Sequence, residues 1–347
     1  MSGGVRFHLV GRDEFSPNLW IVTTSPLLGL PTMDADRRRV ENALLSAVRT
    51  PDAYLTEIAS HLISAGGKRL RPVMTIVASC VGTDGPAIEE AILGGISCEL
   101  VHLGSLYHDD VMDESTTRRG VDTVNAKWGN LQAILAGDFL LARASEIAAG
   151  LGTEVAGLLA RTIGRLCEGQ IEELRHTYNV ARPVDSYLTS IDGKTASLYS
   201  TAARIGGIVA GHDRETIDLL TDYGTAYGMV FQIVDDVLDL TATDEELGKP
   251  AGHDMEEGVY TLPVLLTLAA GGAASNELTD ILGKPLSSYE RDKALSIVRS
   301  GPGVASAIDS AQSYVQLCDQ YCNKLPQSAA TDALRAAPSA LLNSVIR

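Results

Sequence analysis

The sequence predicts an all-α protein, on three observations. Only 5% of the 347 residues are aromatic, whereas Ala and Leu, which favour helices over strands, recur in runs such as 133–141 and 155–159. No well-separated runs of alternating β-branched residues bounded by tight turns are present, so a sheet has no support. Apolar residues at helical spacing form two long stripes, one at Ile92, Ile96, Leu100, Leu103 and Tyr107 and one at Tyr223, Tyr227, Val230, Val234 and Val237.

Turn-forming residues divide the chain into successive helices. A helical pattern opens at Met33, and the acidic Asp13 and Glu14 exclude a signal peptide, so we expect residues 1–32 to be a flexible leader. No Ser/Gly-rich or Pro-rich linker separates two halves, so residues 33–347 are expected to form a single all-α domain. The breaks between helices are expected at 66–67, 82–86, 118–129, 181–183, 248–258, 271–272, 284–285 and 301–303.

Charge and cysteine content exclude several classes of function. Lys and Arg number 28 against 44 Asp and Glu, and the resulting net charge of −16 disfavours binding to nucleic acid or to an anionic membrane surface. No apolar stretch reaches the ~18 residues of a membrane helix. The five cysteines are odd in number and contain no C-x-x-C, which argues against a disulfide framework or a zinc site and fits a reducing cytoplasm.

One acidic motif occurs twice, each time at the end of an apolar stripe. Asp109-Asp110-Val111-Met112-Asp113 recurs as Asp235-Asp236-Val237-Leu238-Asp239. Residues four apart share a helix face, and like charges there, near the negative end of the helix dipole, require a compensating cation. Carboxylates are hard ligands, so the motifs predict Mg²⁺ bound together with a diphosphate. Solvated acidic helix ends are the alternative; a Ca²⁺ loop would need a Gly and a terminal Glu that are missing.

Cations cluster in two places against this acidic background. These are 66–72, with the sequence Gly-Gly-Lys-Arg-Leu-Arg-Pro, and 118–120, with Arg-Arg-Gly. Glycine allows close approach of the backbone to an anion and Arg binds phosphate oxygens in pairs, so a second, metal-free phosphate site is predicted. Surface charges in loops are the alternative interpretation.

Taken together, the motifs resemble the trans-prenyl diphosphate synthase (polyprenyl synthetase) family. The resemblance runs from about residue 60 to 266 and rests on residues 67–72, 109–120, the Gly-Lys-Thr at 193–195 and the Phe-Gln at 231–232 before the second acidic motif. It implies an isoprenoid synthase-type helical bundle around a central cavity, in which the two acidic motifs face each other. Three Mg²⁺ ions are then expected, with Asp109, Asp113, Asp235 and Asp239 as the metal ligands.

The same resemblance assigns roles to further residues. An allylic diphosphate ionises and its cation condenses with isopentenyl diphosphate before a proton is lost, with Asp109 and Asp235 counted among the catalytic groups. The expected contacts to the allylic substrate are Arg118, Lys194, Gln232 and Lys249. Those to isopentenyl diphosphate are Lys68, Arg71, His102 and Arg119, with a satisfied core histidine as the alternative for His102. The Lys194 carbonyl, the Thr195 hydroxyl and the Gln232 amide oxygen are expected to stabilise the carbocation.

One position departs from the family pattern. Many members carry a Lys after Glu257-Gly258, where this sequence has Val259. One diphosphate contact is then missing, and Lys249 is expected to carry more of that role.

Product length is expected to depend on the helix that leads to the first motif. Gly104, Ser105, Val101 and Cys98 are small or non-aromatic and are predicted to line the path of the growing tail. Short-chain members of the family that the sequence resembles block this path with bulky side chains, so we predict a C35–C50 product, such as a quinone side chain. If the small residues only allow close helix packing and Tyr107 or a partner helix limits the tail, a C20 geranylgeranyl product is the alternative.

Two further alternatives are a class I terpene cyclase and a non-catalytic synthase subunit. The second acidic motif and the basic segment at 66–72 argue against the cyclase, and the six intact aspartates argue against the subunit. The resemblance also implies a homodimer, and we expect its product to pass to a membrane prenyltransferase. The expected location is cytoplasmic, from the cysteine content.

Overall fold

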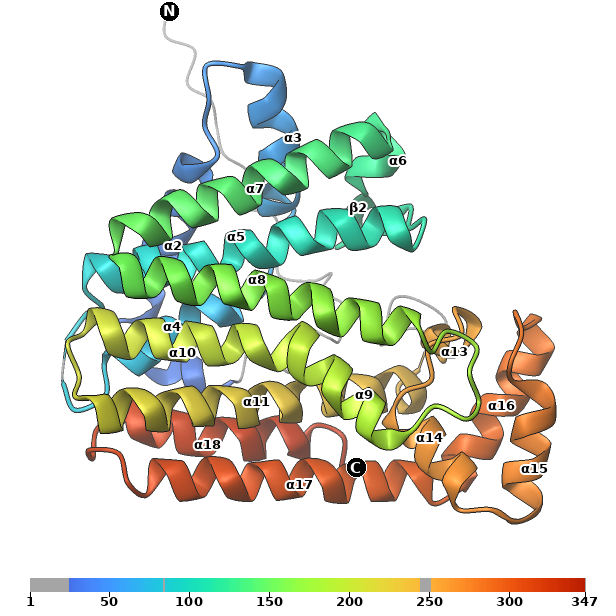
Figure 1. The fold of residues 1–347 in the computed structure, drawn as a ribbon. Coiled ribbons are helices and arrows are strands. Elements are labelled where there is room, and N and C mark those ends of the chain that lie inside the picture. Colours follow the sequence, from blue (N-terminus) through green and yellow to red (C-terminus); the bar gives the residue numbers. More distant parts are fainter. Residues whose placement is uncertain (1–24, 84, 244–250, 347) are drawn as a thin grey trace, which may run out of the picture.

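The computed structural model describes residues 25–83, 85–243 and 251–346, and it is a bundle of helices (Figure 1). The two predicted stripes lie on its central helices, α5 (Glu89–Met112) and α11 (Arg214–Thr241). Around them lie α2 (Met33–Ala47), α3 (Ala53–Ser64), α4 (Leu70–Ser79), α7 (Asn130–Gly150), α8 (Thr153–Leu174), α10 (Ser197–Val209), α17 (Gly303–Cys322) and α18 (Ala329–Asn343). Shorter helices are α6 (Val124–Trp128), α9 (Val184–Ile191), α13 (His253–Glu256), α14 (Leu262–Ala269), α15 (Gly272–Ile281) and α16 (Ser288–Ser300).

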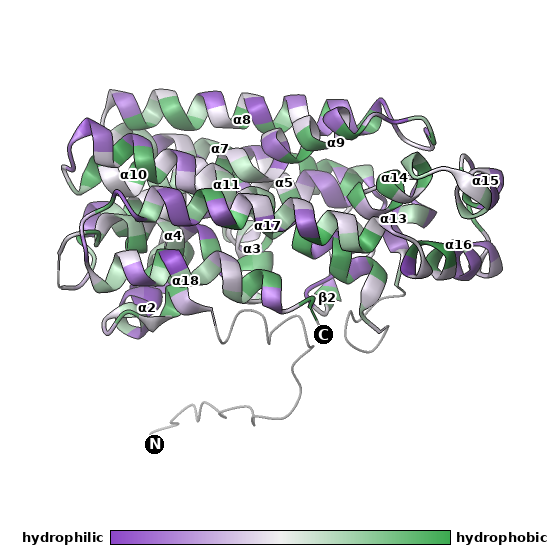
Figure 2. Ribbon diagram, turned by 90° about the horizontal axis from the view of Figure 1, so that it is seen from below, coloured by the Kyte–Doolittle hydropathy of each residue, from purple (hydrophilic) through white to green (hydrophobic). Residues whose placement is uncertain are grey.

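The helices begin where the sequence provides caps. Asp52, Thr123, Asp213 and Ser328 each accept a backbone N–H of the first turn, and Ser287 forms a capping box with Glu290. Packing then holds α5 against α4, α7 and α10, and α11 against α10 and α17. Figure 2 shows hydrophilic and hydrophobic residues alternating along α8, as expected for a helix with one face on the core. Within the described residues, no helix has the length and apolar character to cross a membrane.

Close packing of α11 depends on two glycines. A Cβ at Gly224 would lie 2.7 Å from the Cα of Ser200, and one at Gly228 would lie 2.5 Å from the Cα of Ala196. Both distances are shorter than any real contact, so α11 meets α10 and the turn before it backbone to backbone. The helix pair that carries the second acidic motif is therefore held in one register.

Two features differ from the all-helical expectation. Thr117–Arg118 (β1) and Val121–Asp122 (β2) form a two-stranded antiparallel hairpin directly after the first acidic motif, too short for a strand pattern to be recognised. Pro26–Gly29 forms a 3₁₀ turn (η2) whose Leu27 is fully buried against α18 and α4. Residues 25–32 therefore belong to the packed chain, while residues 1–24 lie outside the described residues.

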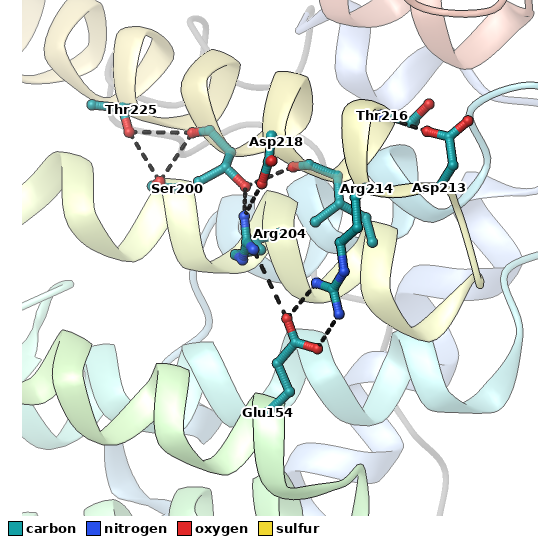
Figure 3. A network of polar contacts seen from close by, with 10 residues as sticks. Glu154, Ser200, Arg204, Asp213, Arg214, Thr216, Asp218 and Thr225 are labelled. Carbon is teal, nitrogen blue, oxygen red and sulfur yellow. Dashed lines mark hydrogen bonds and ion pairs between the residues drawn. The ribbon is translucent and has the colours of Figure 1, made fainter.

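A polar network lies on the surface of the bundle at the beginning of α11 (Figure 3). Arg214 donates to both carboxylate oxygens of Glu154, at 2.5 and 2.6 Å, and Arg204 bonds Asp218 at 2.7 Å. These bonds join the first turns of α8 and α11 to α10. Because the second acidic motif lies near the end of α11, this network is remote from it.

Candidate active site

The two acidic motifs occupy the last turns of α5 and α11. Asp113 caps α5 and its N–H donates to the Asp109 carbonyl at 2.8 Å. In the second motif Asp235 is exposed, whereas Asp236 and Asp239 are buried. Both motifs thus lie at the negative ends of long helices, where a cation is favoured. In Figure 1 the hairpin that follows α5 and helix α13, which follows α11, lie toward the same end of the bundle.

The carboxylates of the first motif are crowded. Burial raises the pKa of Asp109, and the positive charges of Lys194 and Arg118 oppose this rise. Desolvation, and then the charges of Glu257 and Asp109, raise the pKa of Asp113 to about 6. Carboxylates with raised pKa values at the end of a helix indicate a place where positive charge would be stabilising.

Lys194, Thr195 and Gln232 connect the two motifs. The Nζ of Lys194 lies 2.8 Å from Glu173 Oε1. Burial alone would lower the pKa of Lys194, but Glu173 and Asp109 raise it above its ordinary value. The neighbouring Thr195 donates its hydroxyl to Gln232 Oε1 on α11 at 2.7 Å. One turn of chain therefore faces the first motif with its lysine and the second with its threonine.

That turn is a π-helical turn, η3 (Asp192–Ala196), between α9 and α10. It lies against α8, where a Cβ on Gly169 would be 2.6 Å from the Lys194 nitrogen and one on Gly193 would be 3.0 Å from the Gly169 Cα. Only glycine at both positions allows this approach. Because a π-helical turn is wider than an α-helical turn, Lys194 and Thr195 leave the backbone in different directions from those in a regular helix.

The middle aspartate of the second motif, Asp236, is bonded inside the bundle by two neighbouring side chains. Asp236 Oδ1 accepts from Gln232 Nε2 at 2.8 Å, and Asp236 Oδ2 accepts from the Tyr187 hydroxyl at 2.5 Å. Burial, followed by the charge of Asp254, raises the pKa of Asp236 well above its ordinary value. Asp236 is thus enclosed between Gln232 and Tyr187 inside the bundle, whereas Asp235 is open to solvent.

The basic residues assemble beside the first motif. Burial lowers the pKa of Lys68, and the charge of Asp235 opposes this, so Lys68 lies near the second motif as well. The Arg71 guanidinium lies 4.9 Å from the Tyr199 ring centroid, and its buried Nε has no hydrogen-bond partner among the described residues. Burial and the charges of Arg71 and Arg119 lower the pKa of His102 well below its usual value, so His102 is neutral beside two arginines.

Arg118 and Arg119 are positioned by different partners. Arg118 Nε donates to Asp110 Oδ1 at 2.6 Å, so the middle aspartate of the first motif holds an arginine. Arg119 donates to the Leu62 carbonyl at 3.0 Å and to the Gly66 carbonyl. Arg119 thereby attaches the hairpin to the turn that precedes Lys68.

Arg69 anchors the same turn. Arg69 has a left-handed backbone (φ 51°) and a buried side chain that contacts Glu99 at 3.2 Å, Glu41 at 2.8 Å and the Ile63 carbonyl at 2.8 Å. Because α4 begins at the next residue, this pairing sets the directions in which Lys68 and Arg71 leave the chain.

The expected chain-length residues do not share one environment. Ser105 is half-buried and donates to the His102 carbonyl at 2.9 Å, and Val101 and Cys98 are fully buried. Burial raises the pKa of Cys98 to about 12, so it is a neutral thiol. Gly104 lies against α7, because a Cβ there would lie 3.0 Å from the Gly137 carbonyl oxygen. Position 104 is about 140° around the helix from Asp109, and its place on the path of the tail stays a prediction.

Three residues of the site were not singled out from the sequence. Glu173 lies on α8, and Tyr187 and Arg182 lie on or next to α9, all far along the chain from both motifs. The spacing E-G-Q-x-x-E at 168–173 is the only local signal for Glu173. Lys249 lies outside the described residues, so its expected contact with substrate stays a prediction.

The segment after the second motif is attached to the loop after α8. Tyr178 N–H donates to the Gly258 carbonyl at 2.8 Å, and its hydroxyl donates to the Glu256 carbonyl at 3.3 Å. Gly258 has a positive φ of 78°, and a Cβ there would lie 2.5 Å from the Tyr178 ring. The attachment keeps Glu257 near Asp113, as the pKa of Asp113 shows.

Comparison with known proteins identifies the family. The polyprenyl synthetase family model matches residues 52–298. The chain belongs to the polyprenyl synthetase family. It is 38% identical to a nonaprenyl diphosphate synthase of Mycobacterium tuberculosis over 299 residues, which cover 86% of this chain and 89% of that protein.

Solved polyprenyl synthetases have the same fold. A heptaprenyl diphosphate synthase of Staphylococcus aureus superposes with a TM-score of 0.84 at 31% identity, covering 90% of this chain and 98% of that one. A polyprenyl synthase of Caulobacter crescentus, complexed with calcium and isoprenyl diphosphate, has the same TM-score and identity over 91% and 96% of the chains. A geranylgeranyl pyrophosphate synthase of Corynebacterium glutamicum has a TM-score of 0.79 at 36% identity over 90% and 96%. The predicted all-α isoprenoid synthase fold is thus confirmed.

Proposed function

We propose that this polyprenyl synthetase condenses isopentenyl diphosphate with an allylic diphosphate between its two acidic motifs and repeats the step to a C35–C50 product. The observation that carries the proposal is the link formed by Lys194 and Thr195. The positive charge of Lys194 interacts with Asp109 and Asp113 of the first motif. The Thr195 hydroxyl donates to Gln232, which in turn donates to Asp236 of the second motif. Long-chain relatives such as the nonaprenyl and heptaprenyl synthases support the long product over the C20 alternative.

The donor set suits Mg²⁺. Across the described ranges, no three His, Cys, Asp or Glu side chains cluster closely enough to hold an ion by themselves. Mg²⁺ usually takes one or two carboxylates and completes its shell with substrate phosphate and water, which is what Asp109, Asp113, Asp235 and Asp239 offer. We assign these four residues to three ions, which when bound would supply positive charge against the diphosphate that leaves.

The chain's own residues then have distinct tasks. Lys194 and Arg118 present positive charge to the allylic diphosphate as its C–O bond breaks, because negative charge develops on the leaving oxygen. The Thr195 hydroxyl oxygen and the Gln232 amide oxygen direct lone pairs at the allylic cation. No side-chain nucleophile is required, since the double bond of isopentenyl diphosphate attacks the cation.

Isopentenyl diphosphate is assigned to the basic residues beside the first motif. Lys68, Arg71 and Arg119 would bind its diphosphate, and the unpartnered Nε of Arg71 is a donor available for this purpose. His102 is neutral there, and so acts as a hydrogen-bonding group and not as a third cation. The proton lost after condensation is proposed to pass to the departing diphosphate.

The test is incubation with radiolabelled isopentenyl diphosphate, Mg²⁺ and C5, C10, C15 and C20 primers, followed by sizing of the products. Asp235→Asn should lower the rate on the order of a hundredfold or more, because one ligand charge is lost. Asp222→Asn, the same change on the same helix but remote from the motif, should leave it unchanged. Transfer without any divalent ion, or full activity in Asp235→Asn, would contradict the proposal. A cyclic hydrocarbon product would instead favour a terpene cyclase.

We further propose a homodimer through α7. Leu131, Ile134 and Leu135 lie on one face of that helix and are 75%, 42% and 67% exposed. Large apolar residues grouped in this way mark a protein interface. Gel filtration of the wild type and of Leu131→Glu should show a dimer that the charge disrupts. Cytoplasmic location and delivery of the product to a membrane prenyltransferase stay predictions.

A further inference from the structure

A chain of hydrogen bonds connects Tyr187, by way of Asp236 and Gln232, to Thr195. Tyr187 donates to Asp236 Oδ2 at 2.5 Å, and Gln232 Nε2 donates to Asp236 Oδ1 at 2.8 Å. The Gln232 oxygen accepts the Thr195 hydroxyl at 2.7 Å. Tyr187 is 2% exposed, so its hydroxyl is protected from competition by bulk water.

The direction of these bonds fixes the orientation of Thr195. The amide of Gln232 turns its NH₂ toward Asp236 Oδ1 and its oxygen toward the Thr195 hydroxyl. The hydroxyl proton of Thr195 is then directed at Gln232. The lone pairs of the Thr195 oxygen therefore point away from Gln232 and are free to face a cation.

Arg182 holds the beginning of this chain. It is 5% exposed, donates to Ser190 Oγ at 2.7 Å and to the Tyr260 carbonyl at 3.3 Å, and its guanidinium lies 5.7 Å from the Tyr187 ring centroid. Arg182 thus places a buried guanidinium beside both Tyr187 and Asp236. It also attaches α9, which carries Tyr187, to the segment after the second motif.

We propose that Tyr187, supported by Arg182, is a positioning residue that fixes the Thr195 hydroxyl toward the allylic cation by way of Asp236 and Gln232. The inference rests on the proposed function, because it assigns Thr195 to the reacting carbon. It adds to that function the part of the chain, outside the recognised motifs, on which the orientation of Thr195 depends.

A double-mutant cycle tests it. Tyr187→Phe keeps the ring and removes the donor, and we expect kcat to fall about tenfold while KM for isopentenyl diphosphate changes less than about twofold. Thr195→Val removes the group that Tyr187 is proposed to position. In the Thr195→Val background, Tyr187→Phe should therefore have almost no further effect on kcat.

Two controls separate positioning from stability. Tyr223→Phe removes another buried hydroxyl bond, 2.7 Å to the Leu334 carbonyl, remote from the site, and should lower Tm similarly without changing kcat. Arg182→Lys should retain most of the kcat that Arg182→Met loses. If Tyr187→Phe does not fold, Arg182→Lys and Arg182→Met are compared with and without Thr195→Val. The difference in kcat between the two Arg182 variants should then nearly vanish when Thr195→Val is present.

The outcomes are distinguishable. Equal fractional losses of kcat from Tyr187→Phe with and without Thr195 would overturn the inference, as would a loss confined to Tm. A rise in the Mg²⁺ concentration needed for half-maximal rate would also overturn it, because Tyr187 would then act on the metal ligands. Wild-type protein that transfers no isopentenyl unit would refute the proposed function itself.

Discussion

Replacing Gly169 by Ala should push Lys194 and Thr195 out of place. The added Cβ would lie 2.6 Å from the Lys194 nitrogen and 2.7 Å from the Ser190 carbonyl oxygen, and both are backbone atoms that cannot rotate away. Restoring an ordinary contact of 3.4 Å requires α8 and η3 to separate by about 0.8 Å. Such overpacking costs about 1–3 kcal/mol.

Gly164→Ala is the matched control, because Gly164 lies on the same helix with no atom within 4 Å of the added Cβ. There, Ala should raise the free energy of unfolding by about 0.5–1 kcal/mol, by reducing the freedom of the unfolded chain. Gly169→Ala gains the same amount from the unfolded chain. The free energies of unfolding of the two variants should therefore differ only by the packing cost at Gly169, about 1–3 kcal/mol.

Urea unfolding and steady-state kinetics provide the measurements. A displacement approaching 1 Å at the reacting groups should lower kcat by roughly tenfold to a hundredfold in Gly169→Ala. Gly164→Ala should match the wild type. If the two variants are equally stable and equally active, the contact between α8 and η3 does not position the site.

Three further predictions follow from the site. Arg69→Met should lower the free energy of unfolding by about 3–5 kcal/mol in urea, since Glu99 is left buried without its cation, and Glu99→Gln added to it should recover part of that loss. Ser105→Phe should shorten the product on thin-layer analysis, and an unchanged size distribution would exclude position 105 from the tail path. Because the pKa of Asp113 is raised to about 6, the folded chain retains the proton more tightly than the unfolded chain. With EDTA present, Tm should therefore fall as the pH rises from about 4 to 6, and it should fall less in Asp113→Asn.

Much of the site followed from local pattern, because the motif residues lie four apart on helices whose apolar stripes are strong. The helices around both aspartate motifs were predicted, and α5 and α11 confirm them. Glu173 and Tyr187 were missed because each meets the site only through tertiary packing, which leaves no periodic signal.

The hairpin and the buried Leu27 were missed for a different reason. Two-residue strands are too short to form a recognisable sequence pattern, and the burial of Leu27 depends on contacts with α18 and α4 that only the folded chain provides. The partners of the basic residues were also beyond the sequence. Nothing in the spacing of Arg118 indicates that it pairs with Asp110.

The glycine contacts that join α11 to α10, and α8 to η3, restrict how substrates reach the aspartates. Helices that touch through their backbones cannot slide apart without losing those contacts along their length. Any opening that admits two diphosphates and releases a long hydrocarbon must then come from the connecting segments at the aspartate end of the bundle. The Tyr178 attachment to Gly258 joins two of these segments, so an opening there requires them to move together or to part.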